Sequence, residues 1–99
     1  MAEVPVFLRP LGENDPEFAQ RVVDLMAFAN AAGALDAKTK TLMSLLADAI
    51  LGHPDGVAAI AGRARQQGAS EQEIAETVRM AFMAGGLPAL ATGLRAFRQ

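Results

Sequence analysis

The feature that most constrains the fold of this chain is the alternation of helix-start signals and helix-ending glycines along most of its length. Proline, aspartate or serine precedes each segment in which apolar residues recur at helical spacing. Glycine follows three of these segments, where a left-handed residue commonly ends a helix. The pattern predicts helices that start after Asp15, Asp36, His53, Ser70 and Leu87. The first three are expected to end at about Ala32, with Gly33 as a left-handed exit, and at Gly52 and Gly68.

The last third of the chain carries the clearest of these signals. Ser70 and Glu73 have the spacing of a capping box, in which each residue satisfies a backbone N–H of the other. Apolar side chains then surround most of the segment Thr77 to Ala84, so we expect Phe82 to be buried. The pair Gly85-Gly86 is expected to interrupt this helix, and Pro88 to open a final one.

The predicted fold class is all-α, a compact antiparallel bundle of about five helices. β-branched residues are sparse and alanine is abundant, which favours helices over strands. Residues 1–14 contain Pro5, Pro10 and Gly12 without a helical period, and Val4, Val6 and Leu8 alternate. We therefore expect an extended N-terminal arm over residues 1–14 and a single helical domain over residues 15–99.

Composition narrows the function classes. The chain has 99 residues, 52% of them hydrophobic, no cysteine and a formal net charge of −2. Cysteine-based redox chemistry is excluded, and the charge is unsuited to holding a nucleic acid. No uninterrupted apolar run is long enough to span a membrane, so we expect a cytoplasmic protein. The apolar excess in so short a chain favours self-association.

Three segments taken together resemble a known family. They are Leu35-Asp36-Ala37-Lys38-Thr39, the turn at Gly68 followed by Glu73-Ile74-Ala75-Glu76, and Gly85-Gly86-Leu87-Pro88-Ala89-Leu90. Their order and spacing resemble the carboxymuconolactone decarboxylase and alkylhydroperoxidase D-like family over roughly residues 34 to 97. The resemblance implies a symmetric homo-oligomer, such as a hexamer built as a trimer of dimers.

The family's reactive positions fall at the junction of the second and third predicted helices. Redox-active relatives carry a Cys-x-x-Cys pair and a histidine there, and the matching positions in this chain are His53, Gly56 and Ile60. The decarboxylase branch is similar at two histidine positions, which correspond to Ile60 and Met80. The resemblance therefore places Ile60 and Met80 in a ligand pocket but supplies neither branch's catalytic side chains.

His53, the only histidine, is the candidate catalytic residue, because imidazole exchanges protons near neutral pH. Asp48 and Asp55 are its candidate partners by proximity in the sequence. The alternative is structural: a histidine after a helix end can bind the last carbonyls, and His-Pro-Asp is also a turn that starts the next helix. One histidine and two carboxylates do not predict a metal site, and no cofactor is expected.

Two classes of function remain open from the sequence. The first is a homo-oligomeric protein without redox cysteines that binds a small organic molecule in an apolar cavity or serves as a scaffold. The second is a cofactor-free enzyme of decarboxylase or lactone-processing type, in which His53 acts as general acid or base. An enzyme requires a polar partner beside His53 in an accessible pocket, whereas a binding protein or scaffold does not.

Overall fold

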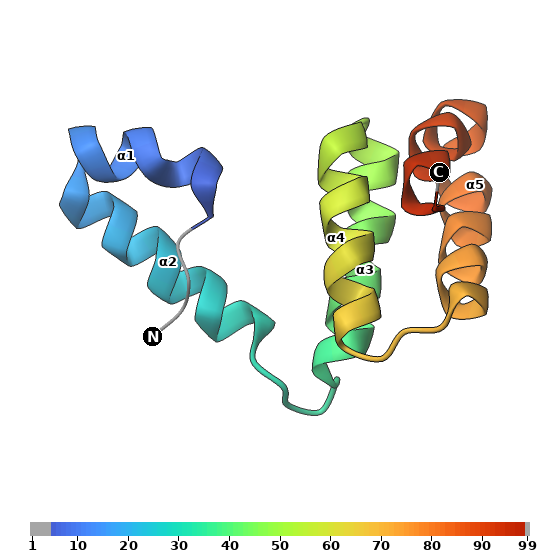
Figure 1. The fold of residues 1–99 in the computed structure, drawn as a ribbon, viewed down its shortest axis with the longest axis horizontal. Coiled ribbons are helices and arrows are strands. Elements are labelled where there is room, and N and C mark those ends of the chain that lie inside the picture. Colours follow the sequence, from blue (N-terminus) through green and yellow to red (C-terminus); the bar gives the residue numbers. More distant parts are fainter. Residues whose placement is uncertain (1–4, 99) are drawn as a thin grey trace. The chain divides into compact units, whose positions relative to one another are not determined.

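The computed structural model describes residues 5–98, and all regular structure in that range is helical. The chain forms two compact units, of which the first reaches to Ala32 and the second begins at Gly33 (Figure 1). The all-α prediction is confirmed. The single domain expected over residues 15–99 stays a prediction.

The start of the chain is helical where it is described. A short 3-10 helix, η1 (Val6–Leu8), leads into α1 (Arg9–Asn14). The extended conformation predicted for residues 1–14 is therefore wrong for residues 6–14, and residues 1–4 lie outside the described range. Pro10 is compatible with α1 because it lies in the first turn, where a backbone N–H has no partner within the helix.

Helix α2 (Pro16–Asn30) starts as predicted and ends differently. Asp15 is its N-cap and accepts a hydrogen bond from the Phe18 N–H at 3.2 Å. The helix ends at Asn30 because Ala31 turns to an extended conformation, with φ −61° and ψ 141°. Gly33 does not have a positive φ, so the left-handed exit predicted at that residue is wrong.

The second unit is an antiparallel arrangement of three helices, α3 (Ala37–Leu51), α4 (Pro54–Gln66) and α5 (Glu71–Gly93), followed by the 3-10 helix η2 (Leu94–Ala96). Helix α3 packs against both α4 and α5 (Figure 1). The core is built mainly from small side chains around Leu45, Val57 and Ile74, each of which is fully buried. Alanine-rich helix faces let the helices approach closely, which explains the abundance of alanine in the sequence.

Predicted boundaries in the second unit match the structure closely. Asp36 caps α3 by accepting from the Thr39 N–H at 2.7 Å. Gly52 and Gly68 follow α3 and α4 with φ of 80° and 92°, values that side chains other than glycine's rarely permit. Gly86, with φ 76° and ψ −161°, breaks the helical path inside α5, so the interruption predicted before Pro88 is confirmed.

Candidate functional site

The turn between α3 and α4 positions the single histidine. The Gly52 N–H donates to the Ala49 carbonyl at 3.3 Å, and the His53 N–H donates to the Asp48 carbonyl at 2.9 Å. These two bonds satisfy two of the last four carbonyls of α3, and His53 lies immediately before α4. The His53 side chain makes no capping hydrogen bond to α4. The contact of His53 with the end of α3 is made by its backbone N–H.

The His53 side chain instead pairs with Asp48. Nδ1 of His53 lies 3.1 Å from Oδ1 of Asp48, and the side chains are 58% and 24% exposed. A carboxylate only accepts hydrogen bonds, so Nδ1 is the donor in this contact, and in the neutral imidazole Nε2 is then the acceptor nitrogen. Gly56 makes room for the pair, because a Cβ at this position would collide with Oδ2 of Asp48.

The structure separates the other predicted site residues from this pair. Asp55 forms an ion pair with Arg95, with 3.3 Å between Oδ1 and the guanidinium. Ile60 is partly buried and packs against the core of the second unit. Met80 is 58% exposed and lines a shallow depression between α3 and α5 that does not include His53. Asp48 and His53 are therefore the predicted residues that the fold brings together.

A second candidate site is an apolar groove along one side of α5. We call it the α5 groove; it has a volume of about 530 Å³ and is lined by Ala75, Val78, Arg79, Phe82, Met83, Leu90 and Phe97. Sites for small organic ligands commonly have volumes of about 300–1,000 Å³ and mostly apolar walls with a few polar groups. Arg79 supplies the one charged side chain among these lining residues.

The opposite side of α5 carries a much smaller hollow. We call it the α3–α5 depression; it has a volume of about 200 Å³ and is lined by Thr39, Leu42, Met43, Leu46, Thr77 and Met80. Met43 and Met80 are 52% and 58% exposed at this surface. The buried stripe Ile74, Val78 and Ala81 faces the core between the two hollows.

Phe82 belongs to the α5 groove and not to the core. Its side chain is 40% exposed, so the prediction that it is buried is wrong. Phe82 lies about 100° around the helix axis from Ala81 but only about 40° from Val78, so it stands at the edge of the buried stripe, on the side of the groove. Apolar residues occur on most sides of this helix, and their periodicity alone therefore could not distinguish the core side from the groove side.

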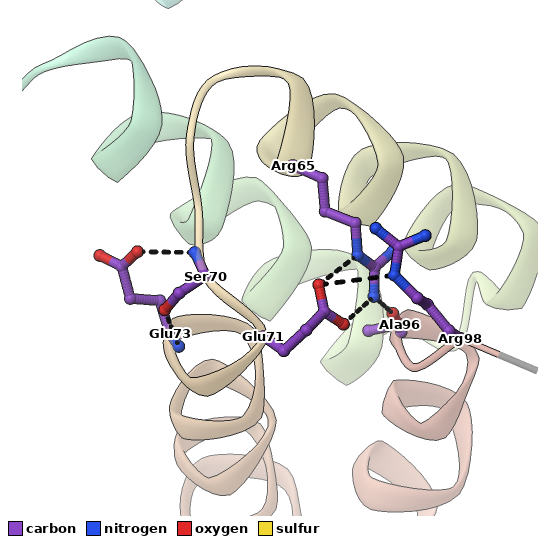
Figure 2. Close-up of polar contacts among 6 residues, drawn as sticks. All are labelled: Arg65, Ser70, Glu71, Glu73, Ala96 and Arg98. Carbon is purple, nitrogen blue, oxygen red and sulfur yellow. Dashed lines mark hydrogen bonds and ion pairs between the residues drawn. The ribbon is translucent and has the colours of Figure 1, made fainter.

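A polar network at the turn between α4 and α5 positions one wall of the groove (Figure 2). The Arg65 guanidinium donates to both carboxylate oxygens of Glu71, at 2.7 and 2.8 Å, and to the Ala96 carbonyl at 2.8 Å. Nε of Arg98 lies 3.7 Å from Oε2 of Glu71. Since Ala96 precedes Phe97, this network fixes the chain end that contributes Phe97 to the groove.

The same turn carries the predicted capping box, which is confirmed. Glu73 N–H donates to Ser70 Oγ at 3.0 Å, and Ser70 N–H donates to Glu73 Oε1 at 2.8 Å (Figure 2). The hydrogen bond from Ser70, followed by the contact with Lys38, lowers the pKa of the Glu73 carboxyl below its ordinary value. The hydrogen bond from Arg65 likewise lowers the pKa of Glu71.

The α5 groove was not predicted from the sequence, although the sequence contains one indication of it, a helical spacing of three residues. Ala75, Arg79 and Phe82 recur at i, i+4 and i+7 beside the buried stripe, which places them on one side of the helix. Arg79 is the one charged residue between Val78 and Met83. Leu90 and Phe97 come from beyond the break at Gly86, and only the fold shows that they join the same surface.

Two further observations bear on the kind of site. Within residues 5–98, no three His, Cys, Asp or Glu side chains cluster as they would to hold a metal ion. Over the same residues, no helix is long and apolar enough to cross a membrane.

Comparison with known proteins decides the family. The carboxymuconolactone decarboxylase family matches residues 16–99 of the chain, which covers all helices from α2 onward. The chain belongs to the carboxymuconolactone decarboxylase family. The match confirms the family resemblance described above. This carboxymuconolactone decarboxylase family protein contains no cysteine. None of the curated proteins matches it.

Solved structures agree with the family assignment. A carboxymuconolactone decarboxylase family protein from Legionella pneumophila, solved in its apo form, is 28% identical, with a TM-score of 0.84 over 90% of this chain and 80% of that one. A protein from Burkholderia xenovorans LB400, assigned to the carboxymuconolactone decarboxylases, is 27% identical, with a TM-score of 0.85 over 93% and 73%. A family protein from Thermotoga maritima is 30% identical, with a TM-score of 0.73 over 93% and 84%.

Proposed function

We propose that this carboxymuconolactone decarboxylase family protein is a homo-oligomer that binds a small, largely apolar organic molecule in the α5 groove. The observation that carries the proposal is the groove itself, with a volume of about 530 Å³ and six apolar residues in its lining. Phe82, Leu90 and Phe97 offer the flat and branched surfaces that usually bury an organic ligand. Ligand binding would remove this apolar surface from water.

Self-association would cover apolar side chains elsewhere on the second unit. Met43 and Met80 are more than half exposed and border the α3–α5 depression. The depression, at about 200 Å³, is smaller than the usual ligand site and suits a side chain inserted from a second copy. We place the subunit interface at this surface, in a closed assembly such as a hexamer or trimer of dimers. We also propose that the protein is cytoplasmic.

A neutral fluorescent dye tests the binding proposal. N-phenyl-1-naphthylamine is expected to brighten on adding the wild-type protein, because its fluorescence rises in an apolar site. Phe82→Ser should abolish most of this rise, whereas the matched variant Met80→Ser, on the other side of α5, should keep it. Equal brightening by both variants would contradict binding in the groove.

The Asp48–His53 contact favours a second candidate, a cofactor-free acid–base enzyme. Asp48 orients the imidazole through Nδ1, so Nε2 is available to take a proton from a bound substrate or from water. A small lactone such as dihydrocoumarin is a suitable probe of this chemistry. Hydrolysis should fall with both His53→Gln and Asp48→Asn, and equal rates in the three proteins would rule the candidate out.

A further inference from the structure

Arg79 gives the α5 groove a chemical preference that its apolar walls do not. It lines the groove together with Phe82 and Met83 and is exposed. Within the described residues it forms no ion pair, whereas Arg65, Arg95 and Arg98 each pair with a carboxylate. The groove therefore combines an apolar surface with a cation that has no anionic partner in the described part of the chain.

We propose that the α5 groove binds an amphipathic carboxylate, with its hydrocarbon part against Phe82, Leu90 and Phe97 and its carboxylate paired with Arg79. This inference rests on the proposed function, because it names the ligand class for the same groove. A guanidinium matches a carboxylate in both charge and planar geometry, since two of its N–H groups can donate to the two oxygens. A neutral ligand would leave Arg79 without this pairing.

The size of the preference follows from the exposure of Arg79. Solvent screens an exposed ion pair, so the carboxylate should improve affinity by about two- to fivefold at low salt. Added salt should reduce this gain, while the contribution of the hydrocarbon chain should persist. Glu76, three residues before Arg79 and also exposed, is the nearest acidic residue in the sequence and would oppose a second negative charge on the ligand.

Three molecules with the same eight-carbon chain test the inference by displacing N-phenyl-1-naphthylamine at neutral pH. Octanoate should displace the dye at the lowest concentration, followed by 1-octanol and then octylamine. Arg79→Gln should make octanoate and 1-octanol nearly equal, and Arg79→Lys should retain part of the preference. The matched control is Arg63→Gln, because Arg63 is also exposed and without an ion pair in the described residues but does not line the groove.

The outcomes separate the two proposals. If the dye binds but octanoate and 1-octanol are equal in the wild-type protein, or octylamine is strongest, the carboxylate inference is wrong and groove binding stands. A preference for octanoate that persists in Arg79→Gln also overturns the inference, because the anion then pairs elsewhere. If a second copy fills the groove, the dye will bind only after the assembly is dissociated, and both proposals fail.

Discussion

The two sides of α5 that flank its buried stripe differ in size, composition and charge. The α5 groove is about 530 Å³, with two phenylalanines and an arginine, whereas the α3–α5 depression is about 200 Å³, with two threonines and no charged residue in its lining. Both sides expose methionine, so hydrophobicity alone does not distinguish them. The difference is the basis for the two proposals, which assign ligand binding to the groove side and association with a second copy to the depression side, while the buried stripe packs the core.

Removing a residue from the buried stripe should have the largest effect on stability. Ile74 is fully buried, so Ile74→Ala should lower the free energy of unfolding by about 2–5 kcal/mol through lost contacts and a cavity. Met80→Ala, six residues later on an exposed side, should cost less than about 1 kcal/mol in the dissociated chain. Urea unfolding measures both, and equal losses would mean that the two positions are not as different in burial as described.

Placing a charge on the depression should act on assembly. If the α3–α5 depression lies at the subunit interface, Met80→Glu buries an unpaired carboxylate and should weaken association by roughly 2 kcal/mol or more. Met83→Glu, on the groove side, should leave the assembly intact. Light scattering distinguishes these results. Dissociation by Met83→Glu alone would place the subunit interface at the groove instead of the depression. A monomeric wild-type protein would contradict self-association.

The capping box at the start of α5 stabilises the helix that carries both the groove and the depression. Ser70→Ala removes the side-chain bond to the Glu73 N–H and should cost about 1 kcal/mol of stability. Because the groove and the depression both depend on the same helix, dye binding and assembly should be unchanged where the protein stays folded. A selective loss of dye binding would show that the cap acts on the groove in a way that the structure does not explain.

Acid should produce the smallest change. The contacts of Glu71 and Glu73 lower their pKa values below the ordinary value of 4.5, so the folded protein releases these protons more readily than the unfolded chain. The resulting stabilisation is present well above pH 4.5 and is lost as the pH falls through the lower, folded values. Glu71→Gln should make this acid-induced loss shallower in urea unfolding between pH 7 and 3. An unchanged pH profile would contradict the linkage.

Local signals in the sequence were reliable where a boundary depends on neighbouring residues. The caps at Asp15, Asp36 and Ser70, and the break at Gly86, depend on side chains or backbone geometry within a few positions. The predicted end of α2 was wrong, because Ala31 already leaves the helical conformation two residues before Gly33. The helical start of the chain was also missed, since Pro10 is equally suited to an extended arm and to a first helical turn.

The candidate sites were less predictable because they depend on how distant segments meet. The pairing of Asp48 with His53 could be predicted, since the two residues are five positions apart across one glycine turn. Arg65 contacts Glu71 across the turn between α4 and α5 and the Ala96 carbonyl 31 residues later, and no local sequence pattern indicates either contact. The groove likewise needs Leu90 and Phe97 beside Phe82, which periodicity within one segment does not reveal.

The most direct test of the account is methionine-methyl NMR of the assembled protein with ¹³C-labelled methionine, during a titration with octanoate. Met83 lines the α5 groove, while Met43 and Met80 line the α3–α5 depression, so each side of α5 carries its own probe. The account predicts that the Met83 signal shifts progressively with octanoate while the Met43 and Met80 signals stay in place. Shifts confined to Met43 and Met80, or no shift at any of the three, would contradict it.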